Sequence, residues 1–221
     1  MEIKAIGFDV DGTLYPSSQM VFSAVSSFIF APVLMYNFAK VRREIRRITY
    51  DGDLREMQAT LVARRMGIDP EKAFHRIERD LYGRWERSFR YIKPFPGVRE
   101  TLLSLSHEGY LLGALSDFPL SQKLRYLKVD DLFSVRLSSE ETGYLKPSSV
   151  PFLQLARRLG AAPEEVLYVG NNGEYDICGA ASVGMKTAHI ARSAKGEEKA
   201  DFVFQNFFQL RDWVASGMSS R

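Results

Sequence analysis

Residues 3–14 read IKAIGFDVDGTL, and this stretch decides the fold of the chain. An apolar run with β-branched residues ends in two acids one residue apart, Asp9 and Asp11, and Gly-Thr follows. The pattern predicts a buried strand whose carboxyl end carries two carboxylates into a loop. Open α/β sheets bind their ligands at that end of their strands, so this loop is the first candidate for a functional site.

The two acids have the spacing of a reactive pair. Asp9 is placed to act as a nucleophile, and Asp11 can reach the same bound group as a proton donor and acceptor. Gly12 allows the backbone to approach an anion closely, and Thr13 adds a hydroxyl. A strand that simply ends in an acidic turn would have the same sequence pattern. Residues elsewhere in the chain are needed to distinguish a reactive pair of acids from such a turn.

Strands and helices alternate in the second half of the chain. The predicted strands cover residues 110–115, 133–137, 166–169, 186–190 and 201–204, and the predicted helices cover residues 98–108, 120–127, 148–159 and 177–183. This alternation indicates βαβ crossovers and a parallel sheet with helices on both faces, a Rossmann-like α/β architecture. The first strand belongs to the same sheet, because its apolar run needs cover on both sides.

Residues 17–92 are predicted to form an all-helical domain inserted into this α/β core, which comprises residues 1–16 and 93–221. Helical periodicity dominates the insertion and predicts about four helices. Within it, Gly67 is expected to end one helix, and Asp69 and Pro70 to begin the next. Gly52 and Gly83 are expected to mark breaks.

The segment from Gly12 to Ala39 contains no charged residue. A single membrane crossing there would leave Asp9 on one side and everything after Lys40 on the other, so we expect no membrane span. The segment is better interpreted as a helix with a broad apolar face, interrupted near Pro32 and packed under other helices or against a second subunit, which makes a homodimer possible. Peripheral contact with a membrane surface is the less favoured alternative.

Composition favours an ordinary globular protein. The 221 residues are 45% hydrophobic and 26% charged, and the net charge of +3 is too small to indicate a nucleic-acid partner. Residues 17–93 hold 15 Lys/Arg and 9 Asp/Glu, so the insertion is more basic than the rest of the chain. The single Cys178 cannot form an internal disulfide, and this suits a cytoplasmic protein.

Four arginines in the insertion lie on one side of a predicted helix. They are Arg42, Arg43, Arg46 and Arg47. Their spacing is compatible with a wall that attracts an anionic substrate. It is equally typical of a solvated helix face that is partly paired with Glu44 and other acids.

Polar residues follow three of the predicted strands. Asp9 and Asp11 follow the first, Ser116 and Asp117 end the second, and Gly170-Asn171-Asn172-Gly173-Glu174-Tyr175-Asp176 follows the strand at 166–169. Because the carboxyl ends of parallel strands lie along one edge of the sheet, these residues are expected to converge. Lys146, which precedes Pro147 at the entrance to a helix, is a fourth candidate.

In order and spacing these residues resemble the motifs of the haloacid dehalogenase superfamily over nearly the whole chain. Its Asp-x-Asp-Gly-Thr motif stands here as residues 9–13, its serine after an apolar strand as Ser116, and its lysine as Lys146. Its fourth motif, Gly-Asp with a following acid, stands here as Gly170-Asn171 with Asp176. The helical insertion after the first motif resembles the family's helical cap.

The resemblance implies a Mg²⁺-dependent phosphatase that acts on a small phosphorylated metabolite. Asp9 would attack phosphorus to form an aspartyl-phosphate, and Asp11 would protonate the leaving oxygen and then deprotonate water. The implied phosphate-binding residues are Ser116, Asp117, Lys146, Gly12 and Thr13. The implied metal ligands are the Asp9 side chain, the Asp11 backbone carbonyl, the Asn171 side chain and Asp176, although Asp176 has the alternative role of orienting Lys146.

Asn171 departs from the family pattern, in which an acid occupies this position. A neutral amide oxygen removes one full charge of attraction for Mg²⁺, about 4 kcal/mol at an effective dielectric constant near 20 before solvation returns most of it. We therefore expect metal affinity to fall about tenfold to a thousandfold. Glu174 or Asp176 is in a position to compensate.

Two other functions fit the same residues. The chain is alternatively a binding protein of this fold with weak or no turnover, an interpretation motivated by Asn171 and by the apolar segment of the insertion. A phosphomutase is the third hypothesis. Dehalogenases of the family lack the second acid of the first motif, so Asp11 favours phosphate chemistry over halide removal.

Overall fold

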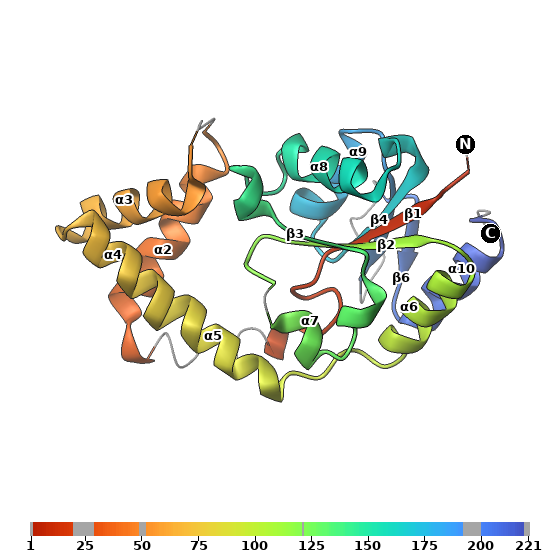
Figure 1. Cartoon of the computed structure of the whole chain (residues 1–221), viewed down its shortest axis with the longest axis horizontal. Helices are drawn as coiled ribbons and strands as arrows, with labels where there is room; N and C mark the ends of the chain where they lie inside the picture. The colour runs from red at the N-terminus through yellow and green to blue at the C-terminus, as the bar shows by residue number, and fades with distance from the viewer. Residues whose placement is uncertain (1, 20–28, 49–51, 121, 192–199, 219–221) are drawn as a thin grey trace.

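Six parallel strands form one sheet in the order β3-β2-β1-β4-β5-β6 (Figure 1). The computed structural model describes residues 2–19, 29–48, 52–120, 122–191 and 200–218. The strands are β1 (Ala5–Phe8), β2 (Leu111–Ser116), β3 (Val135–Ser138), β4 (Val166–Gly170), β5 (Lys186–Ile190) and β6 (Phe202–Phe204). Each strand predicted from the sequence is present.

Strand β1 occupies the centre of the sheet. Its last residue, Phe8, pairs with Ala114 of β2 on one side and with Val169 of β4 on the other. The loops that follow these three strands therefore leave the sheet next to one another. This register brings the first, second and fourth candidate motifs to one edge, as the sequence predicted.

Helices cover both faces of the sheet. Figure 1 shows α6 (Val98–His107) and α10 (Phe207–Ala215) on one face, and α8 (Ser149–Leu159) and α9 (Gly179–Ala181) on the other. The alternation of β1 divides its side chains between two hydrophobic cores, with Ile6 and Phe8 in one and Ala5 in the other. These layers confirm the predicted fold class.

Gly7 shows how closely α8 approaches the sheet. A Cβ atom at this position would lie 2.7 Å from Cδ2 of Leu155 in α8. A methyl group here would displace the side chains of Leu155 and Tyr168, which pack directly against the strand.

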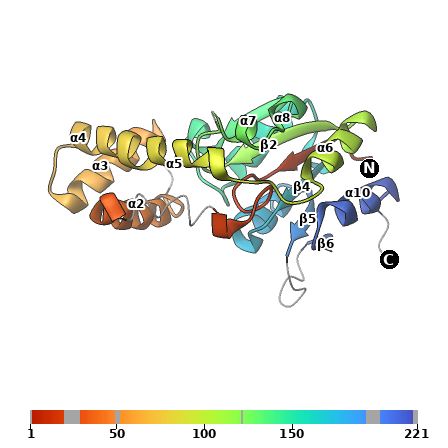
Figure 2. The ribbon, with the colours of Figure 1, turned by 90° about the horizontal axis from the view of Figure 1, so that it is seen from below.

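The inserted segment is helical throughout its described part and lies beyond the carboxyl ends of the strands (Figures 1 and 2). It comprises α2 (Pro32–Ile45), α3 (Leu54–Met66), α4 (Pro70–Arg76), a π-helical turn (Ile77–Tyr82), α5 (Gly83–Ser88) and a 3-10 turn (Phe89–Tyr91). The remaining short helices are α7 (Lys123–Tyr126), the 3-10 turns Asp130–Leu132, Ser139–Thr142 and Pro163–Glu165, and a π-helix (Gly173–Cys178).

The predicted helix ends in the insertion are present with one exception. Gly67 ends α3 in the left-handed conformation, and the Asp69 side chain accepts hydrogen bonds from the first turn of α4. Gly83 does not break the helix, because its φ is −65° and the helical run continues through it. The burial of Leu81 and Trp85 on either side outweighs the modest cost of a glycine inside a helix.

The uncharged segment is interrupted where Pro32 predicted. Helix α2 begins at Pro32, and it buries Leu34 and Phe38. Residues 20–28, which belong to the same predicted helix, lie outside the described residues. Among the residues that the structure describes, no helix combines the length and the apolar character needed to cross a membrane.

Candidate active site

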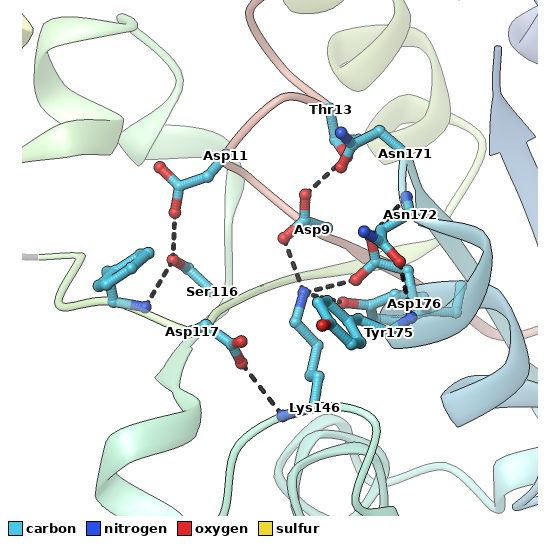
Figure 3. Close-up of polar contacts among 12 residues, drawn as sticks. Asp9, Asp11, Thr13, Ser116, Asp117, Lys146, Asn171, Asn172, Tyr175 and Asp176 are labelled. Carbon is cyan, nitrogen blue, oxygen red and sulfur yellow. Dashed lines mark hydrogen bonds and ion pairs between the residues drawn. The ribbon is translucent and has the colours of Figure 1, made fainter. Parts of the chain in front are cut away.

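Asp9 follows β1 and lies almost completely buried, with 4% of its surface exposed. Its two carboxylate oxygens have different partners: Oδ1 lies 2.7 Å from Nζ of Lys146, and Oδ2 accepts a 2.6 Å hydrogen bond from the Thr13 hydroxyl (Figure 3). The backbone N–H of Asp9 donates to the carbonyl of Val169 in β4. The sheet and two side chains thus fix the position of this carboxylate.

Lys146 joins the first and fourth motifs. Its ammonium group lies 2.7 Å from Asp9 and 2.5 Å from Oδ1 of Asp176, and it also donates to the Tyr168 hydroxyl at 3.4 Å. Figure 3 shows the lysine reaching up between the two carboxylates. One buried cation therefore serves two buried anions, and the balance of charge in this half of the site is negative.

Because Asp9 is buried and shares one lysine with Asp176, the pKa of Asp9 is raised. Burial, and after it the charge of Asp176, raise the pKa of Asp9 to about 7, although Lys146 opposes both effects. Burial alone would lower the pKa of Lys146, but the charges of Asp176 and Asp9 outweigh it and raise that pKa well above the usual value. Lys146 therefore remains a cation.

Asp11 points away from Asp9 and has its own set of donors (Figure 3). Tyr15 donates to Oδ1 at 2.5 Å and Ser116 donates to Oδ2 at 2.6 Å. Nζ of Lys123 lies 2.8 Å and 2.7 Å from the two oxygens. Burial would raise the pKa of Asp11, but the charge of Lys123 and these hydrogen bonds outweigh burial and lower it.

Ser116 ends β2 and binds Asp11. Its Oγ accepts from the backbone N–H of Phe118 at 3.0 Å and donates to Asp11. Asp117 turns away from Asp9: one of its carboxylate oxygens lies 2.6 Å from Arg46, and the other accepts from the Lys146 backbone N–H at 3.1 Å. Asp117 thus holds the lysine loop in place, and its expected contact with phosphate stays a prediction.

Gly12 and Asn171 meet where the first and fourth loops cross. Gly12 has a φ of +97°, and a Cβ atom there would lie 2.4 Å from Nδ2 of Asn171. Oδ1 of Asn171 lies 3.2 Å from the Thr13 hydroxyl, which also binds Asp9. Oxygens of Asp9 and Asn171 therefore converge on one point, the Thr13 hydroxyl, and both are oxygens of the kind that Mg²⁺ accepts as ligands.

Asp176 has no oxygen directed at that point. Its Oδ1 binds Lys146, and its Oδ2 accepts from the backbone N–H of Asn172 at 3.0 Å. This geometry matches its alternative role of orienting Lys146.

Hard oxygen ligands suit Mg²⁺, and Asp9, the Asp11 carbonyl and Asn171 supply oxygens of that kind. Within the described ranges, no group of three or more His, Cys, Asp and Glu side chains is arranged to hold a metal ion. Asn171 contributes a neutral amide oxygen, and the carboxylates of Asp11 and Asp176 are bound to other groups. The residues fit Mg²⁺ in kind, but with less charge than a set of three acids.

The four arginines at the end of α2 and directly after it divide into two pairs. Arg42 is buried and binds Glu140 at 2.5 Å, and Arg46 binds Asp117 and the Lys146 carbonyl. Arg43 and Arg47 are exposed. The second pair forms a solvated face, whereas the first pair is bound to acids of the core, and its role as a wall that attracts an anionic substrate stays a prediction.

Sequence reasoning missed three residues of the site. Tyr15 and Lys123 bind Asp11, and Tyr168 binds Lys146. In the sequence, the positions of Tyr15 and Tyr168 are typical of core residues, and the position of Lys123 is typical of a charged residue on a surface helix. Only the folded chain brings Lys123 to a carboxylate that lies 112 positions away.

Comparison with known proteins agrees with this geometry. The chain is 36% identical over 199 residues to a glyceraldehyde 3-phosphate phosphatase of Methanopyrus kandleri, covering 86% of this chain and 84% of that protein. It is 25% identical over 222 residues to the pyrophosphatase PpaX of Halalkalibacterium halodurans, covering 97% of this chain and 98% of the relative.

The fold recurs in solved structures. That of a 2-haloacid dehalogenase from Pseudomonas syringae pv. Tomato superposes with a TM-score of 0.72 at 22% identity, covering 97% of this chain and 99% of that one. The family model described as haloacid dehalogenase-like hydrolase matches residues 3–184, which include the whole cluster around Asp9. The chain therefore belongs to the haloacid dehalogenase-like hydrolases.

Proposed function

We propose that this protein is a phosphatase that removes phosphate from a small phosphorylated metabolite, with Asp9 as the nucleophile. The observation that carries the proposal is the position of the Asp9 carboxylate, buried at the end of the central strand between Lys146 and Thr13. The relatives named as phosphatases support it. Asp11, the second acid of the pair, supports phosphate chemistry over halide removal.

The reaction would proceed in two balanced steps. In the first, an Asp9 oxygen bonds to phosphorus and the bond from phosphorus to the ester oxygen breaks. Asp11, whose pKa Lys123 lowers in the free protein, takes up a proton as the substrate binds and gives it to that ester oxygen. In the second, water attacks the aspartyl-phosphate, Asp11 takes the proton of the water, and the bond between Asp9 and phosphorus breaks.

Each remaining side chain has a role that follows from its position. Lys146 offsets negative charge beside Asp9, and Ser116 holds a phosphoryl oxygen once its hydroxyl turns from Asp11. Asp176 and Asp117 hold the lysine. Mg²⁺, held by Asp9, the Asp11 backbone carbonyl and Asn171, would offset the repulsion between a dianionic ester and Asp9.

Residues 17–92 are proposed to act as a cap over this site, with residues 1–16 and 93–221 as the core. Arg42 and Arg46 support this role, because both reach from α2 to the loop that follows β2. A cap in this position would exclude water during the first transfer.

A second copy of the chain is the proposed partner. The side of α2 opposite the core exposes a row of apolar side chains: Ile29, Phe30, Val33 and Tyr36, each at least 60% exposed. In sedimentation-velocity experiments we expect a dimer that Val33→Lys converts to a monomer, and a monomeric wild-type protein would contradict this. A cytoplasmic location fits the lone Cys178.

The test is a panel of metabolite phosphates with Mg²⁺, run on the wild-type protein and on Asp9→Asn. Phosphate release that disappears in the variant supports the proposal. Equal background release in both proteins would leave only the binding-protein hypothesis. Formation of a phosphate isomer without net phosphate release would instead indicate a mutase.

A further inference from the structure

A cavity of about 320 Å³ lies between the inserted helices and the loop after β2. Three residues of its wall contact the Asp11 side of the site. Lys123 binds both oxygens of Asp11, the Phe118 backbone donates to Ser116, and the Phe89 ring packs edge-on against Tyr15 at 5.8 Å. The cavity therefore adjoins the acid that would protonate the leaving oxygen, whereas Asp9 does not line it.

The place of the leaving group follows from the proposed function, on which this inference rests. Displacement at phosphorus occurs in line, so the leaving oxygen lies opposite the attacking oxygen of Asp9. Asp11 has to reach that leaving oxygen to protonate it. The rest of the leaving group then extends beyond Asp11, into this cavity.

Aromatic rings form much of the wall. Tyr82, Trp85, Phe89 and Phe118 all line the cavity, and the Trp85 and Phe118 rings meet edge-on at 4.6 Å. Trp85 is 6% exposed, and its buried indole N–H has no hydrogen-bond partner among the described residues. A buried donor without an acceptor is costly, so a ligand oxygen that accepts from Trp85 would be favoured.

The charges of the wall disfavour a second anion on the ligand. The two cations of the wall both have carboxylate partners already: Arg55 binds Glu78 at 2.6 Å, and Lys123 binds Asp11 at 2.7 Å. A carboxylate or phosphate on the leaving group would compete with Glu78 or Asp11 for these cations, or would bind the Arg55 Nε–H, which has no hydrogen-bond partner among the described residues, whereas a neutral ring needs neither.

We propose that the leaving group of the substrate is an uncharged alcohol that carries an aromatic or other apolar ring, held among Trp85, Phe89 and Phe118. This differs from the inorganic pyrophosphate implied by the name of one relative, whose leaving group is itself an anion. Rings bind such walls by burial of apolar surface and by edge-to-face contact.

The kinetic test compares two esters of primary alcohols, benzyl phosphate and phosphoglycolate, by the ratio of their kcat/KM values. We expect the ratio to favour benzyl phosphate in the wild type and to fall at least about tenfold in Trp85→Ala, with Trp85→Phe keeping most of it. Because the ratio is taken within one protein, a smaller folded fraction cancels. Tyr91→Ala, which removes an exposed aromatic ring from the same segment, is the matched control and should leave the ratio unchanged.

A binding test does not depend on turnover. The chain has two tryptophans, so in Trp213→Phe the fluorescence reports Trp85 alone. We expect 2-phenylethylphosphonate to change this emission and to bind at least about tenfold more tightly than 3-phosphonopropionate. Equal or tighter binding of the carboxylated phosphonate, or preferred cleavage of phosphoglycolate that Trp85→Ala leaves unaltered, would overturn the inference.

The two proposals fail in different ways. Cleavage that favours phosphoglycolate and still requires Asp9 would leave the phosphatase standing and remove only the assignment of the leaving group. Tight binding of the phenyl phosphonate without any Asp9-dependent phosphate release would remove the phosphatase and the assignment of a leaving group with it, and would leave only a cavity that binds the ring.

Discussion

Asp9 and Asp11 lie two residues apart on one loop, yet their surroundings shift their pKa values in opposite directions. Asp9 shares the cation of Lys146 with Asp176, and its pKa rises to about 7. Asp11 has the cation of Lys123 and two hydroxyl donors, and its pKa falls. The chain leaves the strand at Asp9 and turns at residues 11–14, so the two side chains meet different neighbours and acquire different properties.

The two pKa shifts show that the Asp9 half of the site lacks positive charge, whereas the Asp11 half does not. A nucleophilic carboxylate has to be ionised, and Asp9 is only partly ionised near neutral pH because it is buried and shares the cation of Lys146 with Asp176. A divalent ion beside Asp9 would supply the missing positive charge and lower that pKa. The Asp11 half is already neutralised by Lys123 and needs no further ion.

The largest expected effect comes from Lys146→Met, which removes the cation that Asp9 and Asp176 share. Two buried carboxylates then face each other, and loss of one partner from a buried ion pair typically costs about 3–5 kcal/mol. Phosphate release should fall by at least about a thousandfold. Urea unfolding and a phosphate assay measure the two effects.

Lys4→Met is the matched control, because Lys4 also pairs with an acid but is 61% exposed. It should leave both measurements unchanged. The double variant Lys146→Met/Asp176→Asn should recover part of the lost stability, since it also removes one of the two anions. No recovery would contradict the account of a shared lysine.

Asn171→Asp adds a negative charge to the Asp9 half of the site. A carboxylate beside Asp9 should tighten Mg²⁺ binding about tenfold to a thousandfold, because Coulomb attraction at an effective dielectric constant near 20 is large even after solvation is counted. Isothermal titration calorimetry measures the change. Asn172→Asp is the control, since that side chain caps the π-helix at Gly173–Cys178 and is held there by two backbone N–H groups.

An unchanged metal affinity in Asn171→Asp would show that another residue binds the ion. An equal gain in Asn172→Asp would show that the added charge acts at long range and not as a ligand. Either result would remove Asn171 from the proposed metal site.

Lys123→Met removes the cation from the Asp11 half of the site and should reduce stability less than Lys146→Met does. Asp11 would keep its hydrogen bonds from Tyr15 and Ser116, so the expected loss is about 1–3 kcal/mol. The free energy of unfolding from urea titration measures it, beside Lys146→Met under the same conditions. A loss larger than that of Lys146→Met would reverse the assignment of the two halves.

The sheet was predictable because its signal is local. An apolar run bounded by turn residues specifies each strand, and parallel register then brings Ser116, Lys146 and Asn171 to Asp9 without further information. The helix at 207–215 is absent from the predicted elements, although Asn206 caps it. The helix after β4 starts at Gly173, before the predicted residue 177, because the Asn172 side chain caps its first turn.

Side-chain partners were not predictable, because they depend on how separate elements pack. Arg42 and Arg43 are neighbours in sequence, but only Arg42 is buried against the core loops. Lys123 carries no sequence signal that distinguishes it from other lysines. The pKa values of Asp9 and Asp11 shift in opposite directions because of these partners, so the shifts could not be predicted from the sequence.

The smallest expected effect is the dependence of stability on pH in the metal-free protein. A carboxyl group whose pKa is higher in the folded state than in the unfolded state binds more protons when folded, between those two values. For Asp9 these values are about 4 and about 7, so its contribution lowers the free energy of unfolding as pH rises through this window. The slope from one such group is about 1 kcal/mol per pH unit.

Asp11 should give no such slope, because its folded pKa lies below the ordinary value and its stabilising effect is lost only as pH falls below about 4. Unfolding free energies between pH 5 and pH 7 in the presence of EDTA should therefore fall in the wild type and in Asp11→Asn alike. In Asp9→Asn the group responsible is absent, so this part of the slope should vanish and the variant should become the more stable protein near pH 7. Equal slopes in wild type and Asp9→Asn would mean that Lys146 neutralises Asp9 as fully as Lys123 neutralises Asp11, and the two halves of the site would then not differ.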